Sequence, residues 1–284
     1  MKKFILSFLI SFMVAATAHA ASLKETAFDR IMRTHTIRCG YATWPPYLVK
    51  EPNTGKLSGL SYDYMEEIGR ILDLKIDWAE EVDWGSYIEG LNTGRFDLMC
   101  MGDWAIGERL KYSGLTIPMA YSPLYIWAKT GNMKFDNNIE ALNNPVVRLA
   151  VIEGDTSQNV TRLHFPLAKT DALPQTADGA QLLMDVATGK ADAAIVDESM
   201  ADNFMKHNPN SIHRVLSTGP VQVIPDVFVY KEGEQHLGDM LNNAILLINN
   251  TDFEHVLIRK YKVASFPPQH TYDDMNGEKS VKGH

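Results

Sequence analysis

Cysteine is scarce in this chain, which contains only Cys39 and Cys100. Two cysteines cannot build a scaffold of several disulfides, and they lie 61 residues apart, far from the spacing of a metal site. Both fall on strand-like runs. Because disulfide geometry across adjacent parallel strands is usually poor, we expect two buried thiols, although an exported protein can oxidise them.

Positive charge is also in short supply, since 27 Lys and Arg residues stand against 35 Asp and Glu and give a formal net charge of −8. This balance argues against nucleic acid and against an anionic membrane surface as partners. The sequence lacks a nucleophile elbow, a zinc-binding helix and a phosphate-binding glycine loop as well. We therefore expect no hydrolase activity, no metal and no cofactor.

Long apolar runs are absent beyond the N-terminus. Lys2 and Lys3 precede an apolar run over 4–16, which ends in the small-residue sequence Ala-His-Ala at 18–20. This pattern predicts a secretory signal peptide over 1–20, cleaved after Ala20. No later stretch is long enough to span a membrane, and the residue directly after the cleavage site is not a cysteine that could carry a lipid. The mature chain is expected to be soluble, without a membrane anchor, in a bacterial periplasm.

Strand and helix patterns alternate over the first hundred residues. The expected strands cover 36–42, 75–79 and 96–101, and the expected helices cover 60–72 and 84–93. Ser61 is a candidate N-cap of the first helix, Asp83 of the second, and Gly102 is expected to end the third strand. Such alternation is typical of a right-handed parallel sheet with both faces covered by helices.

A second α/β unit begins at Arg148, and two extended crossings near 122–129 and 221–230 bracket it. This layout predicts two lobes joined by two hinge strands, with a discontinuous first lobe and two closing helices near 234–249 and 252–261. The predicted division is a signal peptide (1–20), lobe 1 (21–127), lobe 2 (128–220), a return to lobe 1 (221–266) and a polar tail (267–284).

The stretch 96–109 combines a buried strand, a short loop and Arg109. Ligands of α/β sheets bind beyond the carboxyl ends of strands, and a guanidinium can hold a carboxylate through two parallel hydrogen bonds. For the isolated tripeptide Gly-Glu-Arg (107–109), the preferred interpretation is an arginine on a solvated helix. Tyr41 and Trp44 precede a rigid Pro-Pro loop. Their rings either face a cavity or pack on the core, and the sequence leaves both alternatives open.

Six segments in order resemble the bacterial extracellular solute-binding proteins of family 3. They include IRCGYATWPPY (37–47), WGSYIEGLNTGRFDLMCMG (84–102), GERLKYSG (107–114), GDTS (154–157), GKADAAIVDE (189–198) and NNTDFEHVLIRKYK (249–262). The resemblance implies the type II fold of periplasmic binding proteins, in which two lobes close on an amino acid. It also implies delivery of that ligand to the permease of an ABC transporter, by a monomer.

The same resemblance implies roles for individual residues. Arg109 matches the arginine that binds the ligand's α-carboxylate, and Thr156 matches the residue that binds it from the other lobe, with Ser157 as an additional N–H donor. Asp197 matches the acid that pairs with the α-ammonium; alternatively it is a strand-end residue, and Glu198 is the functional one. Trp44 falls at the aromatic wall, and Tyr41 at a variable pocket position.

The loop after the third strand departs from the family pattern. Gly102 still offers backbone contacts, but Asp103 and Trp104 follow where small hydroxyl residues are usual, and Gly107 replaces a proline. The departure leaves the ligand open. One alternative function is a cyclohexadienyl dehydratase, an enzyme on a similar fold that would use an acid near Arg109. Another is a sensor module that acts through a separate protein.

Overall fold

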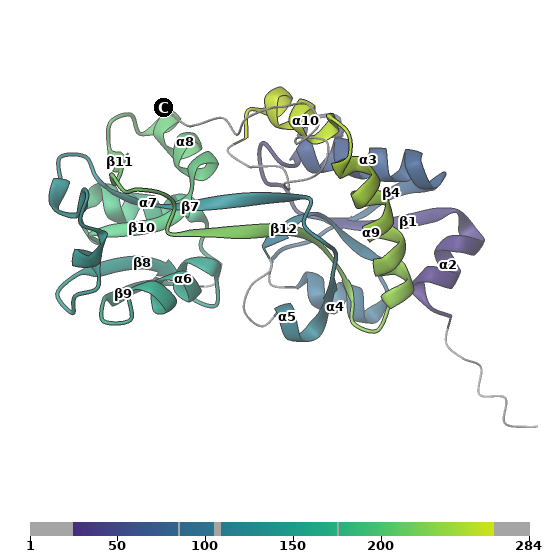
Figure 1. Cartoon of the computed structure of the whole chain (residues 1–284), viewed down its shortest axis with the longest axis horizontal. Coiled ribbons are helices and arrows are strands. Elements are labelled where there is room, and N and C mark those ends of the chain that lie inside the picture. The colour runs from purple at the N-terminus through teal and green to yellow at the C-terminus, as the bar shows by residue number, and fades with distance from the viewer. Residues whose placement is uncertain (1–24, 85, 105–108, 175, 264–284) are drawn as a thin grey trace, which may run out of the picture.

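The computed structural model describes residues 25–84, 86–104, 109–174 and 176–263. Two α/β lobes lie side by side, and the strands β7 (Ala120–Lys129) and β12 (Gln222–Lys231) run from one to the other (Figure 1). The predicted signal peptide (1–20) and polar tail (267–284) lie outside the described residues. The α/β class and the two-lobed architecture are therefore as expected, while the lobe boundaries stay predictions.

The first lobe is a sheet in which β1 lies between β4 and β5 and pairs parallel with both. Its strands are β1 (Thr36–Tyr41), β4 (Lys75–Glu81), β5 (Leu98–Trp104) and the antiparallel β12, with β6 (Ser113–Leu115) pairing β12. One face is covered by α2 (Ala27–Thr34), α3 (Leu60–Leu72), α9 (Gln235–Asn249) and α10 (Phe253–Tyr261). The other face packs on α4 (Tyr87–Thr93). The hairpin of β2 (Val49–Lys50) and β3 (Leu57–Ser58) and the short α5 (Arg109–Tyr112) complete this lobe.

The second lobe repeats this plan. Its parallel strands are β8 (Arg148–Ile152), β9 (Lys169–Leu173) and β10 (Ala193–Asp197), and β7 pairs antiparallel with β10 and with β11 (Ile212–Arg214). One face is covered by α6 (Thr156–His164) with the short helices η1 (Met133–Phe135) and η2 (Ile139–Leu142). The other is covered by α7 (Gly179–Thr188) and α8 (Glu198–His207).

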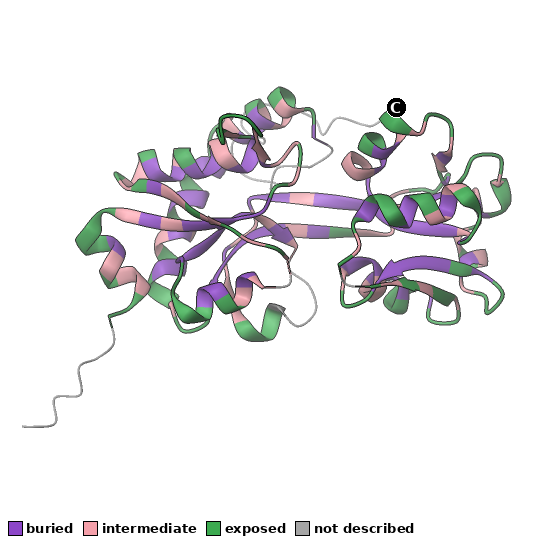
Figure 2. Cartoon of the chain, turned by 180° about the vertical axis from the view of Figure 1, so that it is seen from behind, coloured by how far each residue is buried: buried purple, intermediate pink, exposed green. Residues whose placement is uncertain are grey.

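The two crossing strands are hydrogen-bonded to each other. Residues 120–124 of β7 pair antiparallel with 222–226 of β12, so one ten-stranded sheet continues from lobe to lobe. Over their full length most residues of both strands are buried (Figure 2), although residues 222, 223 and 225 of β12 are not. The hinge is thus a paired ribbon rather than two separate linkers.

Three local expectations were wrong. Gly59, not Ser61, is the N-cap residue of α3, and Ser61 lies in the first turn with its side chain fully buried. Asp83 does not cap α4, because Ser86 holds the N-cap position and donates its hydroxyl to Asp83. Strand β5 does not end at Gly102 but continues to Trp104, because pairing with β12 extends it.

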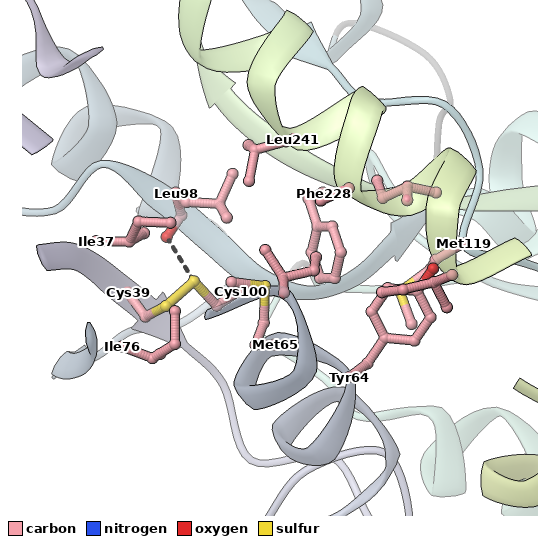
Figure 3. Packing of buried hydrophobic residues seen from close by; sticks show 14 of the residues in the cluster. Ile37, Cys39, Tyr64, Met65, Ile76, Leu98, Cys100, Met119, Phe228 and Leu241 are labelled. Atoms are coloured by element: carbon pink, nitrogen blue, oxygen red, sulfur yellow. Dashed lines mark hydrogen bonds between the residues drawn. A yellow bond between two sulfur atoms is a disulfide. The ribbon is translucent and has the colours of Figure 1, made fainter. Parts of the chain in front are cut away.

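The expectation of two buried thiols was also wrong, because Cys39 and Cys100 form a disulfide with a Cα–Cα distance of 5.3 Å (Figure 3). Cys39 pairs with Leu98 and Gly40 with Met99, and the pairing of β1 with β5 ends there. Cys100 therefore lies just beyond the last regular pair of these two strands, where our expectation from regular parallel pairing does not apply. The disulfide lies in the core beneath α3 and α9.

Candidate functional site

A cavity of about 860 Å³ opens where the two lobes and the hinge strands meet. Its lining comes from the ends of β1, β5 and β10, from the beginnings of α3, α6 and α7, and from both hinge strands. The carboxyl ends of parallel strands and the N-termini of helices therefore point into one space. This is the position at which α/β sheets bind ligands.

Aromatic side chains form the wall that the first lobe contributes. Trp44 is held by a two-way backbone bridge to Leu48, with N–O distances of 2.8 and 2.9 Å. Its ring meets Trp84 edge to face at 6.1 Å between centroids, and Trp84 meets Tyr87 in the same way at 6.4 Å. Because each ring packs against the next, this wall offers an apolar surface of defined position.

Asp103 lies behind that wall and is 3 % exposed. The Tyr87 hydroxyl donates a hydrogen bond to Oδ2, and the backbone N–H of Trp104 donates to Oδ1 at 2.8 Å. Both carboxylate oxygens therefore have a donor. Asp103 adds negative charge to the cavity from a fixed position.

The beginning of α6 faces the cavity from the second lobe. Asp155 caps this helix and accepts the N–H of Ser157 at 2.9 Å, while the Ser157 hydroxyl accepts the N–H of Ile152 at 3.0 Å. The Ser157 N–H that was expected to meet a ligand is thus donated to the cap. Thr156 precedes it, lines the cavity and is 2 % exposed. The positive end of the helix dipole adds to the attraction for a carboxylate.

Asp197 ends β10 and begins α8 at one edge of the cavity. Its Oδ1 accepts the N–H of Met200 at 3.0 Å, whereas its Oδ2 is buried and has no hydrogen-bond partner. Burial raises the pKa of Asp197, and backbone N–H groups at the start of α8 oppose the rise. An unsatisfied buried carboxylate oxygen is costly, so it is a strong acceptor for a ligand ammonium.

Asp226 was not predicted as a site residue. It lies on β12, pairs with Trp104 of β5 and Ala120 of β7, and accepts the Ser122 hydroxyl at 2.8 Å. Burial raises the pKa of Asp226 to about 7, and the charge of Asp197 adds to the rise. The available signal was a single carboxylate in an otherwise apolar strand, since buried acids are rare without a partner.

Seven of the nine predicted site residues line the cavity: Trp44, Gly102, Asp103, Trp104, Thr156, Ser157 and Asp197. Tyr41 does not line it; its side chain is buried against Trp78, with ring centroids 5.9 Å apart. The backbone of Arg109 begins α5, but its side chain lies outside what the structure describes. Glu198, the alternative to Asp197, faces Arg214 at 3.3 Å and is not a lining residue.

Sequence reasoning missed other lining residues besides Asp226. Trp84 was assigned to the apolar face of a helix, but it precedes that helix and faces the cavity. Ser61 was read as a cap, but its hydroxyl is buried at the cavity without a hydrogen-bond partner. The first error follows from a helix start that was predicted three residues too early, and the second from a wrong choice of the N-cap residue of α3.

Two classes of site are not found in the part of the chain that the structure describes. No group of His, Cys, Asp and Glu side chains there is arranged to hold a metal ion. No described helix has the length and hydropathy needed to cross a bilayer.

Comparison with known proteins agrees with the architecture. A curated relative from Haemophilus influenzae, a probable amino-acid ABC transporter-binding protein, is 28 % identical over 76 % of this chain and 80 % of its own. A probable histidine-binding protein from Campylobacter jejuni is 23 % identical over 93 % of this chain and its full length. The crystal structure of an ancestral amino-acid-binding protein, a precursor of cyclohexadienyl dehydratase, is 26 % identical, covers 83 % of this chain and 99 % of its own, and has a TM-score of 0.67.

The sequence profile of the bacterial extracellular solute-binding proteins, family 3, matches residues 37–263. The family and its named relatives are binding proteins rather than enzymes. The match spans both lobes and both hinge strands. This chain therefore belongs to family 3 of the bacterial extracellular solute-binding proteins.

Proposed function

We propose that this protein captures an amino acid between its two lobes and delivers it to an ABC importer. The observation that carries the proposal is the unpartnered Oδ2 of Asp197, which lies at a cavity between the lobes. A buried zwitterion must have both of its charges paired. Asp197 would take the ammonium, and the beginning of α6 with Thr156 would take the carboxylate.

The positions of these groups account for closure. Trp44 and Trp84 belong to the first lobe, whereas Thr156 and Asp197 belong to the second. A ligand held on both sides gains more contacts when the lobes approach, so it stabilises the closed form by its differential affinity. Arg109 is proposed as the carboxylate partner from the first lobe, as the resemblance implies.

The remaining parts of the proposal concern the setting. Family membership and the relatives associated with ABC transporters support a transporter as the partner. We propose the periplasm as the location, a cleavable signal peptide over 1–20 as the export signal, and a monomer as the working form. The dehydratase alternative has less support, because the related ancestral protein is itself described as amino-acid-binding.

A thermal-shift screen tests this proposal. The chain is purified from the periplasm of an expression host, unfolded and refolded without reductant to remove retained ligand, and screened against the common L-amino acids and prephenate. A ligand at a hundred times its dissociation constant adds about 2.7 kcal/mol of stability. We expect a shift with one class of amino acid, and recovery of that ligand unchanged. Turnover of prephenate, or no shift with any amino acid, would contradict the proposal.

A further inference from the structure

The cavity holds a buried carboxylate that a simple zwitterion does not use. We propose that Asp226 forms a second cation subsite, and that the ligand is therefore a positively charged amino acid of the lysine, ornithine or arginine type. This inference rests on the proposed amino-acid-binding function. It assigns the α-ammonium to Asp197 and the side-chain cation to Asp226.

Strand pairing brings both carboxylates to one face of the sheet. Asp226 lies opposite Ala120 on β7, and Asp197 lies opposite Leu124 on the same strand. Directly paired residues of antiparallel strands point to the same face, as do residues an even number of positions apart on one strand. The strands β10 and β12 lie on opposite sides of β7, and the two pairing partners are four residues apart along it, so the two carboxylates enter the cavity at separate points. An elongated ligand with a cation at each end matches two carboxylates that are set apart in this way.

Close packing fixes the Asp226 side chain at the hinge. A Cβ built on Gly102 would lie 3.2 Å from the Asp226 Cβ, so the glycine allows β5 to approach this side chain. The Ser122 hydroxyl holds Oδ2 at 2.8 Å from the neighbouring strand. Trp104, which pairs with Asp226, packs against the core of the second lobe. Asp226 is therefore held where three strands and both lobes meet.

A purely structural role for Asp226 leaves its charge poorly compensated. Ser122 and Trp104 stabilise the carboxylate, but burial and the charges of Asp197 and Asp103 oppose it. A second buried group points to a missing partner as well: the Ser61 hydroxyl lines the cavity, is fully buried and has no hydrogen-bond partner. A cationic side chain would supply a counter-charge to the carboxylate and a donor to this hydroxyl.

The charge of the whole lining favours the same ligand class. Seven lining residues are Asp or Glu, and none of those that the structure describes is Lys, Arg or His. A zwitterion brings no net charge to such an acidic lining, whereas a cationic amino acid brings one positive charge.

Calorimetric titration with matched ligand pairs tests the inference. Arginine is compared with citrulline, its neutral isostere, and lysine with norleucine, which lacks the side-chain ammonium. Wild type, Asp226→Asn and the charge-matched surface control Glu232→Gln are titrated. We expect the cationic member to bind at least about tenfold more tightly in wild type and Glu232→Gln, and this preference to fall to about threefold or less in Asp226→Asn.

A pH series adds a readout that a structural role would not give. Because a cation favours ionised Asp226, wild-type affinity for arginine should rise towards pH 7 and level off above it. This rise of affinity with pH should vanish in Asp226→Asn. Equal binding of citrulline and arginine in wild type would overturn the subsite while leaving the proposed function intact. Cadaverine binding as tightly as lysine would support the subsite and contradict amino-acid recognition. No binding by any amino acid would overturn both.

Discussion

The two walls of the cavity are built by opposite means. The wall from the first lobe consists of interlocked rings, and its carboxylate, Asp103, already has a donor on each oxygen. The wall from the second lobe consists of a helix start and Asp197, whose Oδ2 has no hydrogen-bond partner. The carboxylate of the first lobe is satisfied without a ligand, and that of the second lobe is not.

This difference suggests a division of labour. A satisfied aromatic surface costs little when the cavity is open, and it defines the shape of what can enter. Unsatisfied polar groups favour only those ligands that pair with them. Asp226 belongs to neither wall, because it lies on the hinge strand that joins them.

The largest effect is expected on the unsatisfied side, from Asp197→Asn. Asparagine retains the N-cap of α8, so the fold should persist, but the ammonium loses its charged partner. We expect a loss of about 2–5 kcal/mol of binding free energy, measured by calorimetric titration. Glu198→Gln is the adjacent control and should bind normally. Normal binding by Asp197→Asn together with loss in Glu198→Gln would reverse the two roles.

The hinge is tested by the pH dependence of unfolding of Asp226→Asn. The pKa of Asp226 rises from 3.8 to about 7 on folding, so the folded state favours the protonated carboxyl. That contribution is fully present below pH 3.8 and is lost as the pH rises through about 7. Without ligand, Asp226→Asn should therefore match wild type near pH 4 and exceed it by up to about 4 kcal/mol at pH 8. Urea unfolding at both pH values measures this, and a constant difference would contradict it.

The disulfide stabilises the first lobe only, so its removal should act away from the cavity. Neither Cys39 nor Cys100 is a lining residue. We expect the double variant Cys39→Ala/Cys100→Ala to lose about 2–4 kcal/mol of stability in urea. The disulfide joins residues that are 61 positions apart, and without it this loop no longer restricts the unfolded chain. Ligand affinity at low temperature should be retained. An unchanged urea midpoint would show that the bridge does not contribute.

The smallest expected effect comes from Gly102→Ala. The added methyl group would lie 3.2 Å from the Asp226 Cβ, and relieving this contact should cost about 1–3 kcal/mol. In the Asp226→Asn background, Gly102→Ala should destabilise the protein less only if the asparagine side chain moves away from the added methyl group more easily than the carboxylate does. Gly219→Ala is the matched control, since nothing lies within 4 Å of its added Cβ. Equal stabilities of the two glycine variants would contradict close packing at Gly102.

Periodicity and element order were enough to predict the architecture. Strands such as β1 and helices such as α3 and α9 lie close to their predicted positions because their apolar patterns are regular. The N-caps Asp155, Asp178 and Asp197 carry side-chain hydrogen bonds of the kind that mark a helix start in a sequence. Local chemistry and global fold agree at these positions.

Predictions failed where long-range pairing overrides local signals. Gly102 has the local signature of a strand end. The strand continues past it because β5 pairs with β12, which lies more than a hundred residues later in the sequence. The disulfide joins two residues of neighbouring strands, and no local pattern encodes which residues come together there. Asp226 becomes a cavity residue only because β12 returns beside β5 and β7. The missed features thus concentrate on the contacts of the hinge and of β1 with its neighbours.

The position of β12 also has a consequence for biosynthesis. The sheet of the first lobe needs β12, and its outer face needs α9 and α10, so the lobe that is started first is completed last. By contrast, β7 to β11 form a contiguous segment that can pair as soon as it is made. In the proposed export, Cys39 and Cys100 would emerge long before residue 222, and an early bridge would hold β1 beside β5 until β12 completes the sheet.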